Sequence, residues 1–234
     1  KSSEELAKFW NEAQQSYYKH TELQTLPVHS SLLALAKVNE AKSDDSILEL
    51  AIGNGIGFSC LNQLSKAKVY GGDLSTNMVN SAKELNPLNK DRIDIINNED
   101  LSRFQDGTFR TIVSNFSLHL VNDPLQMLKE VRRVLDSKSK DASAVLSIWG
   151  RPEYNLLFTV VPSILKDMGI ELPKVRSNFH LSEKEVCTSL CKEAGFQNIF
   201  IDYQSNYLNF ETSEDALAII EGPLFSTIFE KIGA

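Results

Sequence analysis

The chain is poor in cysteine and has no long apolar run, and each shortage excludes a class of protein. Among 234 residues there are three cysteines, an odd count without the Cys-x-x-Cys spacing of zinc sites. We therefore expect a reducing compartment, with neither a disulfide framework nor a bound metal. No stretch approaches the roughly 20 apolar residues of a membrane-spanning helix, so no span is expected.

Positive charge is also in short supply. Lysine and arginine number 24 against 31 aspartates and glutamates, and the net charge is −7. Because phosphate backbones require a basic surface, nucleic acid is not the expected substrate. The chain does not open with the charged and apolar regions of a secretory signal. A cytoplasmic location is expected, and since the first residue is Lys1 rather than Met, an organellar location stays open.

The most informative stretch is an apolar run that ends in a glycine-rich turn at residues 47–57. It reads Ile-Leu-Glu-Leu-Ala-Ile-Gly-Asn-Gly-Ile-Gly. The run predicts a buried strand, and a helical pattern begins near Phe58. Glycines allow a close approach of backbone to ligand, and the helix N-terminus offers free N–H groups. A nucleotide-type ligand is therefore expected at this turn.

Two kinds of nucleotide-binding loop compete for this stretch. A dinucleotide loop, Gly-x-Gly-x-x-Gly, would place its third glycine at Phe58, which disfavours a nucleotide-binding oxidoreductase. Read as Glu-x-Ala-x-Gly-x-Gly, the stretch resembles the cofactor loop of class I S-adenosylmethionine-dependent methyltransferases, whose usual form is Asp/Glu-x-Gly-x-Gly-x-Gly. The resemblance implies cofactor binding at Glu49, Ala51, Gly53, Asn54 and Gly55, with Ala51 replacing the first glycine.

An acidic residue ends the second predicted strand. Asp73 lies 20 residues beyond Gly53, the spacing of a βαβ unit, and a carboxylate there can accept hydrogen bonds from both ribose hydroxyls. The segment from residue 71 to Met78 is similar to the Gly-x-Asp-x-Ser-x-x-Met signature of the same family. The resemblance implies that Asp73 binds the ribose, that Leu74 lies against the adenine and that Met78 packs beneath the loop.

Polar residues follow the next two predicted strands, at 92–96 and 111–115. The resemblance places Asn98 where an aspartate usually binds the adenine amino group, and an amide oxygen can accept the same hydrogen bond. Glu99 and Asp100 are alternatives for that role. Ser114 and Asn115 end the central strand, where a parallel sheet keeps its ligand crevice. The Asn/Asp-Pro-Pro-aromatic motif of adenine-amino and glutamine-amide methyltransferases is missing here, which sets those substrates aside.

Residues for the methyl acceptor are predicted from three places. His119 is the histidine nearest the expected crevice and could remove a proton from an acceptor, the alternative being a hydrogen bond within its own loop. Residues 1–45 read as helical, with Leu6, Phe9, Trp10, Ala13 and Tyr17 at helical spacing. In the family this segment often closes over the site as a lid, so Tyr17 and Tyr18 are candidate substrate contacts. The alternative is a surface helix that packs its stripe on the domain.

The remaining segments complete the predicted fold. Pro27 is expected to interrupt the N-terminal pattern, with a second helix over 30–38. Residues 150–181 read as an insertion that builds the acceptor pocket or forms a small satellite core, with Trp149, Tyr154 and Arg176 as candidate contacts. Strands are expected over 198–203 and 207–211, the last one antiparallel.

Together these patterns predict one α/β domain with a Rossmann-like, doubly wound, seven-stranded and mostly parallel sheet. Its parts are an N-terminal lid (1–45), a cofactor-binding core (46–149), the insertion after the fifth strand (150–181) and the C-terminal part of the core (182–234). The resemblance is to the small-molecule branch of the family (type 11, UbiE-like). It implies methyl transfer from S-adenosyl-L-methionine to an O, N or C nucleophile of a small molecule, leaving S-adenosyl-L-homocysteine. The alternatives are a protein-substrate methyltransferase and a non-catalytic binding or scaffold subunit with a protein partner.

Overall fold

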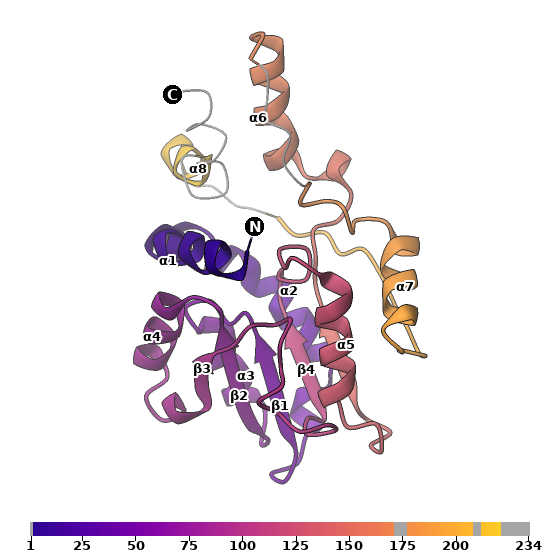
Figure 1. Cartoon of the computed structure of the whole chain (residues 1–234). Coiled ribbons are helices and arrows are strands. Elements are labelled where there is room, and N and C mark those ends of the chain that lie inside the picture. The colour runs from indigo at the N-terminus through magenta and orange to yellow at the C-terminus, as the bar shows by residue number, and fades with distance from the viewer. Residues whose placement is uncertain (1, 171–176, 208–211, 221–234) are drawn as a thin grey trace.

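The computed structural model describes residues 2–170, 177–207 and 212–220. Within these ranges one sheet of five parallel strands forms the centre of the molecule, in the order β3-β2-β1-β4-β5 (Figure 1). The strands are β1 (Ser46–Leu50), β2 (Lys68–Asp73), β3 (Ile93–Ile95), β4 (Thr111–Ser114) and β5 (Ser143–Leu146). Parallel neighbours need crossover connections, and helices supply them.

Eight α-helices and three short 3-10 helices surround the sheet in the described part of the chain. The α-helices are α1 (Ser3–His20), α2 (Glu22–Leu35), α3 (Ile56–Leu64), α4 (Thr76–Leu85), α5 (Pro124–Val134), α6 (Leu156–Asp167), α7 (Lys184–Glu193) and α8 (Ser213–Ile220). The 3-10 helices are η1 (Val38–Glu40), η2 (Lys90–Arg92) and η3 (Pro152–Tyr154). None of the described helices is long and apolar enough to span a lipid bilayer.

Alternate strand residues build two separate cores, one on each face of the sheet. Leu48, Leu50 and Ile112 pack with α5 and α7 on one face, whereas Ile47 and Val113 pack with α2, α3 and α4 on the other. Side chains of successive strand residues point to opposite faces, so β1 and β4 carry apolar residues for both cores rather than an apolar–polar alternation, with Glu49 as a buried polar exception. The Rossmann-like, doubly wound architecture expected from the sequence is confirmed for these five strands.

The strand order places a ligand crevice at one end of the sheet. The chain runs outward from β1 to β3, then crosses back to β4 on the other side of β1. At such a reversal the loops after the two central strands part, and ligands bind at the carboxyl ends of the strands. Figure 1 shows α1 and α2 lying across that end, while α6 projects away from the body and α7 lies beside α5.

The number of strands differs from the prediction. Residues 198–203, expected as the sixth strand, form no strand in the structure. A strand needs a neighbour with which to pair, and apolar content alone does not specify one. Most of the expected antiparallel last strand, at 207–211, lies outside the described residues. The sheet of the described chain therefore has five strands rather than seven.

Pro27 does not interrupt the N-terminal helices as expected, because it lies inside α2. Proline there removes one backbone hydrogen bond. The bond lost is the one to the Leu23 carbonyl. The next two carbonyls accept bonds from outside the helix, since Asn206 Nδ2 donates to Gln24 O at 3.1 Å and Asn115 Nδ2 donates to Thr25 O at 3.3 Å. The second helix consequently begins at Glu22, eight residues before the predicted start at 30.

Candidate functional site

A pocket lies at the carboxyl end of the sheet, between the loops after β1, β2 and β4 and the two N-terminal helices. Many residues that the sequence marked as functional meet there. Its lining includes Tyr17, Ala51, Gly53, Asp73, Leu74, Met78, Asn98, Glu99, Asn115, His119 and Trp149.

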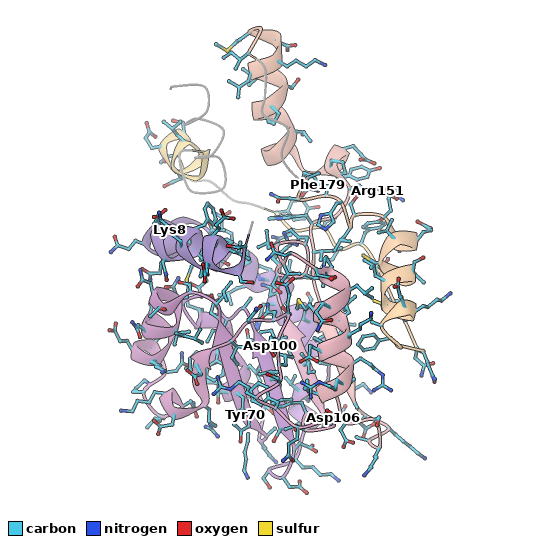
Figure 2. All side chains as sticks on the ribbon, viewed as in Figure 1. Lys8, Tyr70, Asp100, Asp106, Arg151 and Phe179 are labelled. Carbon is cyan, nitrogen blue, oxygen red and sulfur yellow. The ribbon has the colours of Figure 1, made fainter. Side chains whose placement is uncertain are left out.

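The other predicted residues lie elsewhere. Asn54 and Ser114 are buried behind the pocket surface, and Tyr154 is 78% exposed at the end of η3. The side chain of Tyr18 and all of Arg176 lie outside what the structure describes. A second hollow, beside the carboxyl end of α5, is lined by Asp106 and several basic residues and contains no predicted site residue. Figure 2 shows Asp106 at the opposite end of the molecule from Arg151 and Phe179.

Asp73 is the last residue of β2, and its carboxylate accepts hydrogen bonds from the loop after β1 and from the loop after β2. Its Oδ2 accepts a hydrogen bond from the Gly53 N–H at 3.0 Å, and its Oδ1 accepts one from the Ser75 N–H at 2.9 Å. Burial raises the pKa of this carboxyl to about 6, against the opposing effect of these N–H groups. Each carboxylate oxygen can accept a further hydrogen bond, so Asp73 can also bind a pair of hydroxyls that enters the pocket.

The glycine-rich turn uses left-handed backbone at three positions. Gly53 and Gly55 have φ values of 56° and 89°, and Ala51 also has a positive φ of 56°. Alanine pays for this conformation, which only glycine adopts freely. Gly55 is the N-cap of α3. The turn thus connects β1 to α3 at a cost in local strain, as is common near ligand sites, and it places Ala51 and Gly53 on the pocket lining.

Glu49 does not line the pocket. Its Oε1 is 2.8 Å from Nε2 of His29 in α2, and both side chains are 3% exposed. Burial lowers the pKa of His29, but the charge and hydrogen bond of Glu49 together outweigh burial, so the net shift is upward. The acidic residue that the sequence places at the cofactor loop therefore connects this loop's strand to the N-terminal segment.

The His29–Glu49 pair predicts a pH-dependent stability. A histidine whose folded pKa is raised stabilises the fold fully below its unfolded pKa of about 6.5, and this contribution is lost as the pH rises through the folded pKa. We expect the free energy of unfolding to fall from pH 6.5 upward, and the fall to be smaller in His29→Gln, which cannot be protonated. Denaturant unfolding at several pH values measures both slopes. Equal slopes in the two proteins would contradict the prediction.

Polar bonds attach α1 to the loops after β1 and β2. Oδ1 of Asn11 in α1 accepts hydrogen bonds from Ser75 Oγ at 2.7 Å and from the Asn77 N–H at 3.0 Å. Gln14 Nε2 donates to Oδ1 of Asn54 in the glycine turn. Residues 2–35 thus cover the pocket in this structure, as a lid would.

One end of the pocket carries two of the three candidates for adenine recognition, Asn98 and Glu99. Asn98 is buried, and its Nδ2 donates to Ser117 Oγ at 3.4 Å. Glu99 also lines the pocket, and its carboxylate accepts from the Asp123 N–H at the start of α5. Asp100 is exposed, and its Oδ1 accepts from the Ser102 N–H. Asn98 and Glu99 are therefore within reach of a pocket ligand, whereas Asp100 faces away from the pocket lining.

The other end is aromatic. Phe116 and Trp149 stack with ring centroids 4.5 Å apart, and His119 lies at the edge of the Trp149 ring, 6.4 Å between centroids. Phe116 has a positive φ of 52°, a strained value for a bulky residue. Ser147 Oγ accepts from the Phe116 N–H at 2.9 Å and holds this turn in place. The result is an apolar wall with one imidazole, suited to hold an organic acceptor.

Several lining residues were not predicted as site residues. Leu6 and Trp10 share a helical stripe with Tyr17, and the stripe itself was visible in the sequence. Thr21, Thr25 and Asn178 carried no signal, because neither local spacing nor composition distinguishes a polar residue that lines a pocket from one that faces solvent. Within the described residues, no group of three or more potential ligands could hold a metal ion.

The parallel sheet, the left-handed glycine turn and the carboxylate at the end of β2 are the arrangement found in class I S-adenosylmethionine-dependent methyltransferases. Residues 48–140 match the family described as "Methyltransferase domain", the type 11 family, which establishes the methyltransferase class and S-adenosylmethionine as the cofactor. The corresponding predictions from the sequence are confirmed. No curated protein matches this chain in sequence.

Solved structures of similar fold agree with this assignment. The methyltransferase in a complex with the Trm112 methyltransferase activator from Haloferax volcanii has a TM-score of 0.57 at 18% identity, covering 82% of each chain. A candidate S-adenosyl-L-methionine-dependent methyltransferase from Methanococcus maripaludis has a TM-score of 0.53 at 19% identity, covering 78% of this chain and 83% of that one. A candidate methyltransferase from Bacillus halodurans has a TM-score of 0.51 at 19% identity, covering 72% and 69%. At these identities the likeness shows the fold.

Proposed function

We propose that this chain transfers the methyl group of S-adenosylmethionine to an O, N or C nucleophile of a small molecule. The observation that carries the proposal is that one pocket joins two unlike ends. At one end lie Gly53 and Asp73, and at the other the wall of Phe116, His119 and Trp149. A methyl donor and an apolar acceptor can therefore meet within a single enclosure.

The cofactor would lie along the carboxyl ends of β1 and β2. Its ribose hydroxyls would donate to Asp73, its adenine would lie near Leu74 with Asn98 or Glu99 at its amino group, and its methionine part would follow the glycine turn. The aromatic end, formed by Phe116, His119 and Trp149, would then remain for the acceptor of the methyl group.

The chain's own residues would then contribute orientation and exclusion of water. The donor is already activated, so alignment of the acceptor with the methyl–sulfur bond supplies much of the rate. The cover of α1 and α2 keeps solvent from the reacting atoms. His119 is 3% exposed and lies on the acceptor wall, where its imidazole would take the proton from an acceptor that must lose one.

A small-molecule acceptor is favoured over a protein side chain by this cover. Leu6, Trp10 and Tyr17 of α1 form part of the pocket lining, so an acceptor has to fit beneath the helix. A protein substrate, or a scaffold role with a partner subunit, remains the competing proposal. One structure of similar fold is itself a complex with a methyltransferase activator, which makes a partner worth testing.

Calorimetric titration tests the proposal first. We expect S-adenosylmethionine and S-adenosylhomocysteine to bind and NAD to give no heat. Labelled donor then reports transfer to a panel of small acceptors, with a mixture of proteins as the competing acceptor. A folded sample that binds neither S-adenosyl compound would contradict the proposal and favour a scaffold role or a required partner.

A further inference from the structure

A buried carboxylate from the N-terminal segment lies against the glycine turn. Glu22, the first residue of α2, is 5% exposed. Its Oε1 accepts a hydrogen bond from the Ile56 N–H, at the start of α3, at 3.2 Å. Its second oxygen, Oε2, is buried, and among the described residues only the side chain and N–H of the neutral Asn54, besides the Ile56 N–H, act on the carboxylate as hydrogen-bond donors. A buried carboxylate held only by neutral donors is costly, and natural proteins rarely keep one without a use.

Glu22 and Asp73 flank the same residue, Gly53. A Cβ placed on Gly53 would lie 3.5 Å from Oε1 of Glu22, and the Gly53 N–H donates to Asp73. Burial raises the pKa of Glu22, hydrogen bonds from Asn54 and from the Ile56 N–H oppose this, and the charge of Asp73 adds to the rise, so the net shift is upward. Tyr17, which lies beside Gly53 and lines the pocket, has its pKa raised by burial and by both carboxylates. The carboxylates of Glu22 and Asp73 and the hydroxyl-bearing ring of Tyr17 thus all lie beside Gly53 at the glycine turn.

No basic side chain of the described residues compensates this cluster. The ion pairs in that part of the chain involve neither Glu22 nor Asp73. His29, the buried histidine of the same helix as Glu22, is paired with Glu49. Two buried carboxylates without a cation repel each other and are poorly solvated. A positively charged ligand at the glycine turn would remove that cost.

We propose that Glu22, together with Asp73, makes this end of the pocket selective for a cationic ligand, so that the chain binds the methyl donor in preference to the demethylated product. The inference rests on the proposed function. S-adenosylmethionine carries a sulfonium, an ammonium and a carboxylate, for a net charge of +1, whereas the neutral thioether of S-adenosylhomocysteine leaves a net charge of zero. The two compounds are otherwise nearly identical in shape.

Glu22 would distinguish the donor from the product through its charge, at a distance, rather than through direct contact with the ligand. Glu22 itself does not line the pocket, but its helical neighbours Thr21 and Thr25 do, together with Gly53. A ligand whose ribose binds Asp73 and whose chain follows the turn would hold its sulfonium, which lies between these two parts and is the positive group that the product lacks, near both carboxylates. In the low dielectric of a buried site this attraction is far stronger than in water. Loss of the positive charge on methyl transfer would then weaken binding and favour release of the product.

Glu22→Gln tests the inference. Glutamine keeps the shape and the acceptor for the Ile56 N–H but carries no charge. The dissociation constants of S-adenosylmethionine and S-adenosylhomocysteine are measured by calorimetry at pH 8 for both proteins. We expect the affinity for the charged donor to fall by about tenfold and that for the neutral product to change by less than about threefold, because only the donor has a net charge to lose against the carboxylate. The ratio of the two constants is the decisive quantity.

A matched control is Glu12→Gln, which removes the same charge from the N-terminal segment at a side chain that is 69% exposed. The control should leave the ratio unchanged. An unchanged ratio in Glu22→Gln would overturn the inference, and if both affinities fell equally Glu22 would act only by holding the helix on the turn. Failure of the wild-type chain to bind either compound would instead contradict the proposed function, so the two failures are distinguishable.

Discussion

Replacing Asp73 with alanine is expected to abolish measurable binding of S-adenosylmethionine while the chain stays folded. The proposed ribose contact consists of two hydrogen bonds to a carboxylate, each worth about 1.5–3 kcal/mol. Their loss corresponds to a decrease in affinity of about 10²- to 10⁴-fold. The fold should tolerate the change. Two N–H groups lose their acceptor, but this cost is offset because a buried carboxylate, whose pKa burial raises to about 6, is also removed.

The measurement is calorimetric titration, with circular dichroism and thermal unfolding to verify the fold. Asp94→Ala is the matched control, because Asp94 lies on the neighbouring strand β3 with a side chain that is 52% exposed and paired with Arg103. The control should bind the cofactor as the wild type does. Unchanged affinity in a folded Asp73→Ala protein would remove Asp73 from the site.

The cofactor half of the site could be predicted from the sequence because its determinants are local. The glycine turn lies between a strand and a helix that are adjacent in the chain, so apolar periodicity and glycine spacing define it without tertiary information. The same holds for Asp73, which ends a strand and precedes the α4 N-cap Ser75, whose Oγ accepts from the Met78 N–H at 3.1 Å. The structure places β1 and β2 at Ser46–Leu50 and Lys68–Asp73, in agreement with the expected strands, whereas α3 begins at Ile56, two residues before the expected start.

The contacts of the N-terminal segment could not be predicted in the same way. His29 pairs with Glu49 and Glu22 with the Ile56 N–H, across 20 and 34 residues of sequence. A polar residue on a predicted helix has no periodic signature that distinguishes a buried partner from a solvated one. Without that information Pro27 was read as a break, although bonds from Asn115 and Asn206 to the first turn of α2 help to support the helix.

The sheet was overpredicted at its C-terminal side for a related reason. Residues 198–203 have strand-like composition, but their side chains find other partners. Tyr203 Oη donates to Ser182 O at 3.0 Å and accepts from Arg151 Nε at 3.2 Å, and its ring lies beneath the Arg151 guanidinium. Such contacts hold the segment against the chain after β5 without a backbone ladder. Strand propensity describes a surface that can pair, whereas pairing itself depends on the neighbour.

Gly53 and Gly55 of the glycine turn are expected to respond differently when each is changed to alanine, Gly55 mainly in stability and Gly53 mainly in cofactor affinity. In Gly55→Ala the new Cβ would lie 2.8 Å from Ala82 Cβ and 3.0 Å from Ala82 Cα, at a φ of 89°. Left-handed backbone costs an L-residue about 1–2 kcal/mol and overpacking about 1–3 kcal/mol. We expect the free energy of unfolding to fall by about 2–5 kcal/mol.

Gly53→Ala is the matched comparison, because it has the same left-handed strain without the clash. Its Cβ would lie no closer than 3.4 Å to Tyr17, at a φ of 56°, so the expected loss of stability is about 1–2 kcal/mol. Gly53 lines the pocket and Gly55 does not, and the added methyl should therefore cost Gly53→Ala more in cofactor affinity than in stability. Denaturant unfolding measures the loss of stability in each variant, and calorimetric titration measures the loss of cofactor affinity in each. Equal losses of stability in the two variants would contradict the claim that packing against Ala82 requires glycine at position 55. They would also contradict the distinction between Gly55 as a structural glycine and Gly53 as a ligand-facing one.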